Sequence, residues 1–400
     1  MSAFWHGHAG DADWQAALRQ AAGQVEHQRR ATNDAHSPTL GFLYFTDHHR
    51  PQASALLAAV QRQWPGVAWA GAMGVGVAAN GVEYFGTPGL SLMLAALPTD
   101  QFRVFSGAQP LGRFPAHTAL VHADPATPDL QELIAEMSER TASGYLFGGL
   151  ASAREGGALH VADGVFEGGL SGVAFSSAVT LVSRVTQGSQ PVGPVHEVTE
   201  VDGNVILTLD GQPALQVLLA DTGISLQRPQ HAFARLRDTL IGVSEAHETA
   251  VSQAGAFGVD TLVRHLVGLD PGREAIAIAD ELHEGMQLAF CTRHAEAARR
   301  DLVRICSEIR EELAPHAALD VAVRDTLATP APGAGQRIAG AVYVSCAGRG
   351  GPHFGAPSAE LQILRHALGD VPLVGFFAAG EIARHHLYGY TGVLTVFVDD

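Results

Sequence analysis

The segment YVSCAGRGGPHFG, residues 343–355, holds the residue types and spacing that point most directly to chemistry in this 400-residue chain. Cys346 and Arg349 follow a run of small and apolar residues that predicts a buried strand. The glycines around Arg349 let the backbone turn tightly and bring its N–H groups close to a ligand. The Arg349 guanidinium offers a fork of donors that suits a carboxylate or a phosphate, and Gly350 leaves space beside it. The segment therefore predicts an anion-binding loop.

The thiol of Cys346 is the second reactive group in this loop. Because a guanidinium and the N–H groups of a turn stabilise a thiolate, we expect the pKa of Cys346 to lie below its usual value of about 8.5. A thiol enzyme also needs a positioned base, and the loop offers His353, seven residues further on. We therefore expect a ligand-gated or redox-responsive thiol without turnover. Two alternatives stay open: a thiol-dependent enzyme that uses Cys346, and a small cysteine that only fills space in the core.

The carboxylate of Glu381 follows the apolar run FFAAG, where a charged group is normally paired or has its pKa raised by burial. Glu381 could recognise an ammonium group, and together with Arg349 it would suit an amino-acid-like zwitterion. In the alternative, Arg349 caps a helix or pairs with Glu360 or Glu381 inside the protein. Tyr388 could close an aromatic wall of the site, or it could be an ordinary half-buried strand residue.

Three stretches of the chain share one order of elements, and these must position the loop. Residues 40–97, 118–176 and 338–398 each read as a strand, a helix, a second strand and a strand pair. We predict an α/β (α+β) fold in which repeated β-α-β-β-β units form two related halves, with mixed sheets covered by helices. Residues 284–313 indicate a partial fourth unit.

The three copies align on one glycine each, Gly71, Gly148 and Gly375. Six residues further on lie Val77, Arg154 and Glu381. If the copies pack with pseudo-symmetry, Arg154 and Glu381 would face a shared cleft. The alternative is that each is a solvated loop residue.

Composition excludes several classes of function. The formal net charge of −16 argues against nucleic-acid binding, and all 25 basic residues are arginine, so lysine Schiff-base chemistry and a P-loop lysine are excluded. Signatures such as GxSxG, HExxH and a strand-to-helix GxGxxG are missing, so we expect no enzyme. The three cysteines form no CxxC motif, and the spacing of the 20 histidines is not that of metal ligands, so we expect no metal site. The N-terminus reads as no signal peptide, and we expect a cytoplasmic protein without membrane insertion.

Four segments together resemble the FIST family: GHAGDADWQAALRQA, VTEVDGNVILTLDGQPA, SCAGRG and VPLVGFFAAGEIARHHLYGYTGVLTVF. The resemblance covers nearly the whole chain and implies a sensory protein of bacterial signal transduction, with an N-terminal domain over 1–210 and a C-terminal domain over 211–400. It implies that a small ligand, amino-acid-like or an anionic metabolite, binds in a cleft between the two halves. The residues expected to line that cleft are Cys346, Arg349, Gly350, Glu381, Arg154 and Tyr388. The chain has no fused kinase, cyclase or receptor module, so we expect a separate signalling partner protein.

The same resemblance implies an alternative cofactor, because some FIST relatives are similar to haem proteins that sense nitric oxide. No CxxCH attachment sequence is present, so haem would be held non-covalently by one histidine. His353 is the leading candidate because it lies in the glycine loop. The other candidates are His48, His49, His385 and His386.

Overall fold

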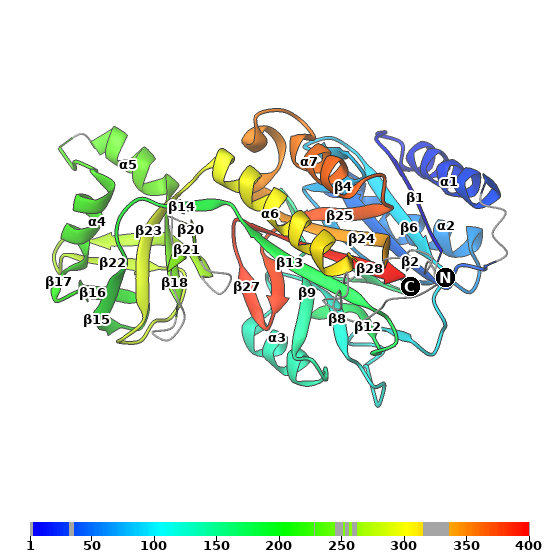
Figure 1. The fold of residues 1–400 in the computed structure, drawn as a ribbon, viewed down its shortest axis with the longest axis horizontal. Helices are drawn as coiled ribbons and strands as arrows, with labels where there is room; N and C mark the ends of the chain where they lie inside the picture. Colours follow the sequence, from blue (N-terminus) through cyan, green and yellow to red (C-terminus); the bar gives the residue numbers. More distant parts are fainter. Residues whose placement is uncertain are drawn as a thin grey trace, which may run out of the picture. The chain divides into compact units, whose positions relative to one another are not determined.

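A computed structural model describes residues 3–31, 36–227, 229–244, 251–252, 256–257, 262–314 and 336–399 (Figure 1). The chain forms two compact units. The first unit is Met1–Thr186, Leu302–His386 and Gly392–Asp400, and the second unit is Gln187–Asp301 and Leu387–Thr391.

The first unit is built on three six-stranded sheets, apart from the end residues of β13, β27 and β28. Sheet 1 has the order β1 (Phe4–Ala9), β6 (Leu90–Ala95), β2 (Leu40–Thr46), β3 (Ala68–Gly74), β10 (His160–Ala162) and β11 (Val165–Phe166). Sheet 2 has the order β27 (His386–Tyr388), β26 (Glu381–Arg384), β9 (Tyr145–Leu150), β8 (Thr118–Ala123), β12 (Leu170–Phe175) and β7 (Phe102–Phe105). Sheet 3 has the order β13 (Leu181–Gln187), β28 (Thr391–Asp399), β24 (Arg337–Cys346), β25 (Leu373–Ala378), β4 (Gly76–Ala79) and β5 (Val82–Phe85).

Helices connect the parallel strands of these sheets. The helices in question are α2 (Ala53–Gln63) after β2, α3 (Leu130–Glu139) after β8 and α7 (Ala359–Leu368) after β24. In α2 the buried side chains Leu56, Leu57 and Val60 recur at a spacing of three to four residues, which gives the helix one apolar face. The remaining helices along this part of the chain are α1 (Trp14–Ala31), α6 (Ala295–Leu313), and the short 3-10 helices η1 (Asp47–Gln52), η2 (Ala347–Arg349) and η3 (Gly351–Phe354).

The predicted repeat is present three times, with one strand more than expected. In each copy the first and second strands are parallel, as in β2–β3, β8–β9 and β24–β25, and the last strand lies antiparallel to the first. The predicted α+β class with mixed sheets and helices is thus confirmed.

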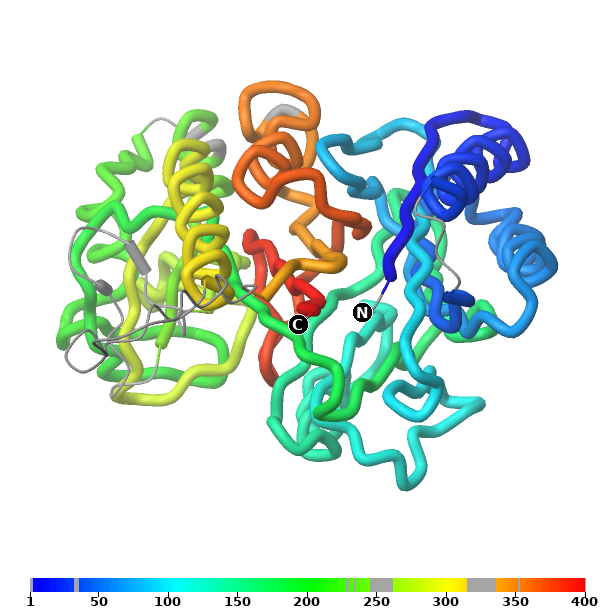
Figure 2. The backbone as a smooth tube through the Cα atoms, turned by 45° about the vertical axis from the view of Figure 1, so that its right-hand side comes forward, coloured from blue at the N-terminus to red at the C-terminus, as the bar shows by residue number. Residues whose placement is uncertain are grey.

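Each copy also hands a strand to the sheet of another copy. β4 pairs with β25, β10 pairs with β3 and β26 pairs with β9, so the hairpin of every copy completes a sheet that it did not start. Apolar runs such as VAWAGAMGVGV therefore split into two strands, β3 and β4, that belong to different sheets. Figure 2 shows N-terminal, middle and C-terminal segments of the first unit interleaved as this pairing requires.

The three aligned glycines lie where two parallel strands approach too closely for a side chain. A Cβ added at Gly71, Gly148 or Gly375 would meet a backbone carbonyl oxygen of the neighbouring strand at 1.8, 2.0 and 1.7 Å respectively. No real Cβ tolerates such a contact, so these glycines fix the same register in all three copies.

The second unit is a closed antiparallel barrel of six strands. In order around it they are β23 (Gln287–Arg293), β15 (His196–Asp202), β16 (Val205–Leu209), β22 (Ala275–Ile278), β21 (Leu262–Asp270) and β18 (Thr239–Ser244), and β18 pairs back onto β23. The core of the barrel includes Ile206, Leu218, Ile276 and Phe290. The shorter elements of this unit are β14 (Ser189–Pro191), β17 (Gln212–Pro213), β19 (Val251–Ser252), β20 (Ala256–Phe257), α4 (Ala214–Thr222) and α5 (Pro229–Asp238).

The barrel corrects the expectation of a partial fourth repeat over residues 284–313. β23, the strand of that segment, has only antiparallel neighbours in the described sheets, whereas the first strand of a repeat needs a parallel one. The apolar alternation of β23 serves the barrel core instead.

Candidate functional site

Arg349, the centre of the predicted anion-binding loop, is 1% exposed and pairs inside the protein. Its Nε and Nη2 donate to Oε1 of Glu360 at 3.0 and 2.8 Å. The guanidinium also lies over the ring of Phe354, 5.2 Å from its centroid. The alternative in which Arg349 pairs with Glu360 is therefore what the structure shows, and anion binding by Arg349 stays a prediction.

The Glu360 carboxylate collects further donors from the strand that precedes the loop. Tyr343 Oη donates to it at 2.7 Å and Ser345 Oγ at 3.1 Å. Burial is the largest single influence on Arg349 and works to lower its pKa, but the charge and hydrogen bonding of Glu360 together with the charges of Tyr343 and Glu381 outweigh burial and leave that pKa raised. Burial and the same carboxylate raise the pKa of Tyr343. We call Arg349, Glu360, Tyr343 and Ser345 the Arg349 network; its charges are of opposite sign and satisfied by protein groups.

The other predicted residues of this region are buried too. Cys346 ends β24 and is 8% exposed, and Glu381 begins β26 and is 0% exposed. A Cβ at Gly350 would lie 2.1 Å from the ring of Phe85, so this glycine admits an aromatic side chain of the protein. The predicted reactivity of the Cys346 thiol stays a prediction.

Tyr388 belongs to the second unit and is 3% exposed. Tyr390, two residues further on, lies between β27 and β28 with a φ of 59°, so the strand does not continue regularly past Tyr388. Tyr390 Oη lies 3.0 Å from Nε2 of His265.

Arg154 is not the structural equivalent of Glu381, which corrects the alignment made from the sequence. Strand pairing places Val77 opposite Phe376, Glu381 opposite Gly149 and His160 opposite Ala72. The loop before β10 is longer than the loops before β4 and β26, and that extra length places Arg154 outside the strand.

Arg154 instead lies in that loop with a side chain that is 46% exposed. Its Nε donates to Asp47 Oδ2 at 2.9 Å and its Nη2 to Asp47 Oδ1 at 2.5 Å. Burial alone would raise the pKa of Asp47, but the bonds from Arg154 outweigh it and hold that pKa below its usual value. Arg154 thus has an anionic partner of its own.

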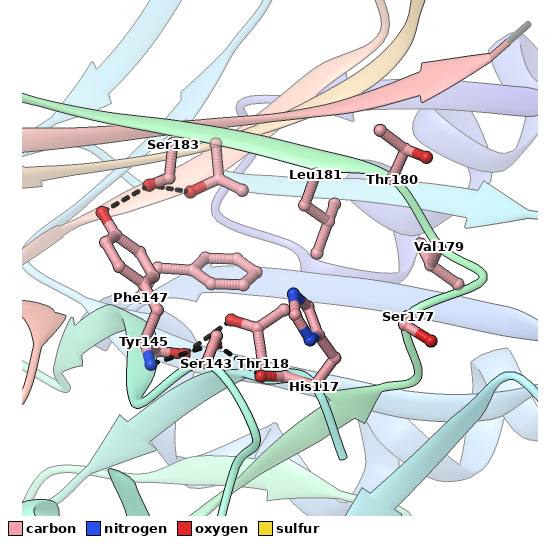
Figure 3. A pocket seen from close by; sticks show the side chains of 11 residues that line it. His117, Thr118, Ser143, Tyr145, Phe147, Ser177, Val179, Thr180, Leu181 and Ser183 are labelled. Atoms are coloured by element: carbon pink, nitrogen blue, oxygen red, sulfur yellow. Dashed lines mark hydrogen bonds between the residues drawn. The ribbon is translucent and has the colours of Figure 1, made fainter. Parts of the chain in front are cut away.

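A pocket of about 340 Å³ opens in the first unit, away from the predicted site residues (Figure 3). It lies between strands of sheet 2 and of sheet 3 together with the segment that leads into β13. Its lining residues are His117, Thr118, Ser143, Tyr145, Phe147, Ser177, Val179, Thr180, Leu181, Ser183 and Thr395.

Three hydroxyl groups of the pocket form a chain that joins the two sheets. Tyr145 Oη in β9 donates to Ser183 Oγ in β13 at 3.1 Å, and Ser183 Oγ lies 2.8 Å from Oγ1 of Thr395 in β28. Dashed lines in Figure 3 mark both bonds. Burial raises the pKa of Tyr145, so its phenol stays protonated at neutral pH. We call Tyr145, Ser183 and Thr395 the hydroxyl chain.

Two more hydroxyls of the pocket are committed to the backbone. Thr118 Oγ1 donates to the carbonyl of Tyr145 at 2.6 Å, and Ser143 Oγ donates to the carbonyl of His117 at 2.5 Å. Figure 3 shows the ring of Phe147 and the side chain of Leu181 forming apolar walls beside these groups. The pocket therefore combines an apolar surface with a small number of fixed polar groups, which is typical of small-molecule sites.

The inner faces of the three sheets meet at three rows of buried residues, which sequence reasoning missed except for Glu381 and Val77. Residues directly opposite each other in neighbouring strands share a face of the sheet. Row 1, in sheet 1, is Ser91, Tyr44, Ala72 and His160. Row 2, in sheet 2, is Ser171, His122, Gly149 and Glu381. Row 3, in sheet 3, is Val393, Val344, Phe376 and Val77.

Polar groups of the first two rows bond to each other. Tyr44 Oη lies 3.1 Å from His122 Nε2, and His160 Nδ1 lies 2.6 Å from Ser171 Oγ. The ring of Phe376 stacks on Tyr44 at 5.3 Å between centroids. Burial, followed by the charge of His160, lowers the pKa of His122 to about 3, so this imidazole is neutral at neutral pH.

One sequence signal could have revealed these rows. The short strands LGFLYFT and TALVHA place a tyrosine and a histidine one residue after the residue that faces the aligned glycine. Successive residues of a strand point to opposite faces of its sheet. Because the tyrosine and the histidine hold the same position relative to the aligned glycine, they lie on equivalent faces of sheets 1 and 2. The contact between two sheets, however, follows only from the exchange of hairpins.

The haem alternative needs a histidine in an apolar cavity, and His353 does not line the pocket. His353 is half-buried in η3, with its ring 5.4 Å from that of Phe354. Haem binding through His353 stays a prediction. Among the described residues, no group of three or more His, Cys, Asp and Glu side chains is arranged to hold a metal ion. Nor does this part of the chain contain a helix with the length and hydropathy to cross a membrane.

Family models and similar proteins both match most of the chain. The FIST N domain matches residues 39–212 and the FIST C domain matches residues 214–384. An uncharacterized protein of Mycobacterium tuberculosis, Rv0628c, is 30% identical over 411 residues, which cover 96% of this chain and 97% of the relative. An uncharacterized protein of Mycobacterium bovis, Mb0898c, is 29% identical, with 96% of each chain covered. FIST domains are associated with sensory signal transduction. With both domains matched in order, the chain belongs to the FIST family.

Proposed function

We propose that this FIST protein is a small-molecule sensor whose ligand binds in the pocket between sheets 2 and 3. The observation that carries the proposal is the pocket itself, about 340 Å³ with apolar walls and a hydroxyl chain. That volume lies within the range of about 300–1,000 Å³ that small-ligand sites occupy. A sensor needs a response to occupancy, and we propose that a separate signalling partner reads it.

The position of the pocket supports a sensory role. Its hydroxyl chain joins β9 of sheet 2 to β13 and β28 of sheet 3, so a ligand that replaces or strengthens these bonds changes how the two sheets are held together. β13 then continues directly into the second unit, which begins at Gln187. A ligand with different affinities for two arrangements of β13 would shift the balance between them.

Two other functions considered from the sequence receive less support. A thiol-dependent enzyme needs substrate access to Cys346, whose exposure is 8%. A haem sensor needs an apolar cavity at its axial histidine, and His353 does not line the pocket. An amino-acid-like or anionic ligand stays a prediction tied to Arg349, and the experiments below distinguish it from an uncharged one.

The test is a thermal-shift screen of a metabolite library against the protein and a variant with a filled pocket. Leu181→Trp places an indole in the cavity from a half-buried position. A ligand at about 100 times its dissociation constant stabilises the wild type by about 2.7 kcal/mol, and we expect Leu181→Trp to lose that stabilisation. Val303→Trp, at a side chain 47% exposed and outside the pocket, is the control and keeps it. A hit that stabilises wild type and Leu181→Trp equally would place the ligand elsewhere.

A further inference from the structure

We infer that the pocket selects an uncharged molecule with a flat apolar body and one group, such as an amide or an alcohol, that both donates and accepts hydrogen bonds. The inference rests on the proposed function, because it names the class of ligand for the same pocket. Three features carry it: the charge of the lining, the hydrogen count of the hydroxyl chain and the shape of the apolar walls.

The lining offers little that could balance a charged ligand, and its one imidazole, that of His117, is exposed. None of the eleven lining residues is Asp, Glu, Lys or Arg. Two guanidinium groups outside the lining, those of Arg184 and Arg384, are close enough to act on Tyr145. Arg184, which follows Ser183 in β13, pairs with Glu308 at 3.3 Å and also with Glu312. A charged ligand would lose hydration without gaining a counter-charge from the lining itself, which weakens its binding.

The hydroxyl chain leaves both kinds of hydrogen-bonding group for a ligand. Three hydroxyls carry three hydrogens, and the two bonds between them use two. One hydroxyl hydrogen is therefore left to donate outward, and lone pairs on Tyr145 Oη are left to accept. The Ser183–Thr395 bond can run in either direction. Since Thr395 is 0% exposed and Ser183 is half-buried, the outward donor is Ser183 when Thr395 donates to it. An amide or an alcohol offers the complementary acceptor and donor.

The apolar walls of the pocket favour a ligand with a flat apolar body beside that polar group. Phe147 is 1% exposed and stacks on Phe175, with 6.4 Å between ring centroids and 17° between their planes. Its ring edge and the side chains of Val179 and Leu181 bound the cavity. A planar ring buries more area against such walls than a polyol does, and burial of apolar area is the main source of affinity for a neutral fragment.

The test compares three probes that each carry one phenyl ring: benzamide, benzoate and benzylammonium. Binding is measured by protein-observed NMR titration at neutral pH for wild type, Tyr145→Phe, Ser183→Ala, Ser307→Ala and Leu181→Trp. We expect benzamide to bind at least about tenfold more tightly than either charged probe, a difference of about 1.4 kcal/mol. We expect Tyr145→Phe and Ser183→Ala to weaken benzamide about three- to tenfold. Ser307→Ala is the matched control, because it removes an exposed hydroxyl of α6 that does not line the pocket, and it leaves the affinity unchanged.

Each outcome separates the class of ligand from the location of the site. Benzoate or benzylammonium binding as tightly as benzamide, with all three lost in Leu181→Trp, would overturn the uncharged class and keep the pocket. Benzamide binding that is lost in Leu181→Trp but unchanged in Tyr145→Phe and Ser183→Ala would reject recognition by the hydroxyl chain. Probe binding that ignores Leu181→Trp, or no binding of any probe at millimolar concentration, would overturn the proposed function as well.

Discussion

The Arg349 network and the pocket are two polar regions of the first unit that solve opposite problems. In the network a guanidinium and a carboxylate are each 1% exposed and lie 2.8 Å apart, so these two groups are bonded to each other. In the pocket the polar groups are uncharged hydroxyls beside open space of about 340 Å³. Charged residues that look reactive in a sequence can therefore be present because a buried charge needs a partner of opposite charge. A ligand site, by contrast, can be built from serine, threonine and tyrosine.

This contrast predicts that interior variants lower the free energy of unfolding, and that pocket variants lower ligand affinity instead. The rows around Tyr44 and His122 belong with the network, because they are buried and bond to each other. The predictions below test that division, beginning with the variant for which it expects the largest effect.

Arg349→Ala should cost about 3–5 kcal/mol of unfolding free energy, because it leaves the Glu360 carboxylate buried without its cation. Chemical denaturation followed by circular dichroism measures the change. Arg365→Ala is the matched control: its ion pair with Asp370 joins side chains that are 55% and 75% exposed, and we expect a loss below about 1 kcal/mol. If Arg349→Ala kept its stability and lost an anionic ligand, the network would be a binding site and the contrast would fail.

Tyr44→Phe should cost about 1–3 kcal/mol, because it removes the hydroxyl at 3.1 Å from His122 Nε2 and leaves that buried nitrogen without its partner. The double variant Tyr44→Phe, His122→Phe removes both polar groups and should recover part of the loss. A single Tyr44→Phe variant as stable as wild type would show that the bond contributes nothing.

Acidification should weaken the first unit through His122. Burial lowers its pKa from 6.5 to about 3 in the folded protein, whereas the unfolded chain takes up a proton near the ordinary pKa. The free energy of unfolding is therefore unaffected by His122 above pH 6.5 and decreases as the pH falls toward the folded pKa. Between pH 6 and 5 the decrease is about 1 kcal/mol per pH unit. His6, whose pKa burial lowers to about 4, acts in the same direction. Denaturation curves of His122→Phe across this range should show a smaller slope than wild type, and equal slopes would contradict the assignment.

Much of the fold could be predicted from periodicity, because each repeat carries its own strands, helix and glycine. Gly71, Gly148 and Gly375 mark the same contact in all three copies, and the sequence alignment on them is correct. The exchange of hairpins could not be predicted, since β4 pairs with β25 in an arrangement that no local pattern reports. The misplacement of Arg154 has the same origin, because only strand pairing shows that His160 holds the equivalent position.

The site was harder to predict than the fold. Loop composition drew attention to Arg349, but whether a guanidinium faces a ligand or a carboxylate depends on where α7 places Glu360, eleven residues further on. The pocket residues come from four separate parts of the chain, and Thr395 is far in sequence from Tyr145. Serine and threonine in strands carry no signal on their own, so only the meeting of sheets 2 and 3 reveals the hydroxyl chain.

Tyr145→Phe should change stability least, by less than about 1 kcal/mol, although it alters the pocket directly. The lost bond to Ser183 Oγ, at 3.1 Å, is one between neutral groups, and Ser183 keeps its bond to Thr395 at 2.8 Å. The ring itself stays, so no cavity forms. Since the pocket admits water, Ser183 can replace its lost donor with solvent, whereas the Nε2 of His122 has no such access after Tyr44→Phe. Denaturation of Tyr145→Phe and Tyr44→Phe therefore compares one chemical change in two environments. A loss in Tyr145→Phe as large as that in Tyr44→Phe would mean that the hydroxyl chain holds the two sheets together, and that its role is structural before it is one of recognition.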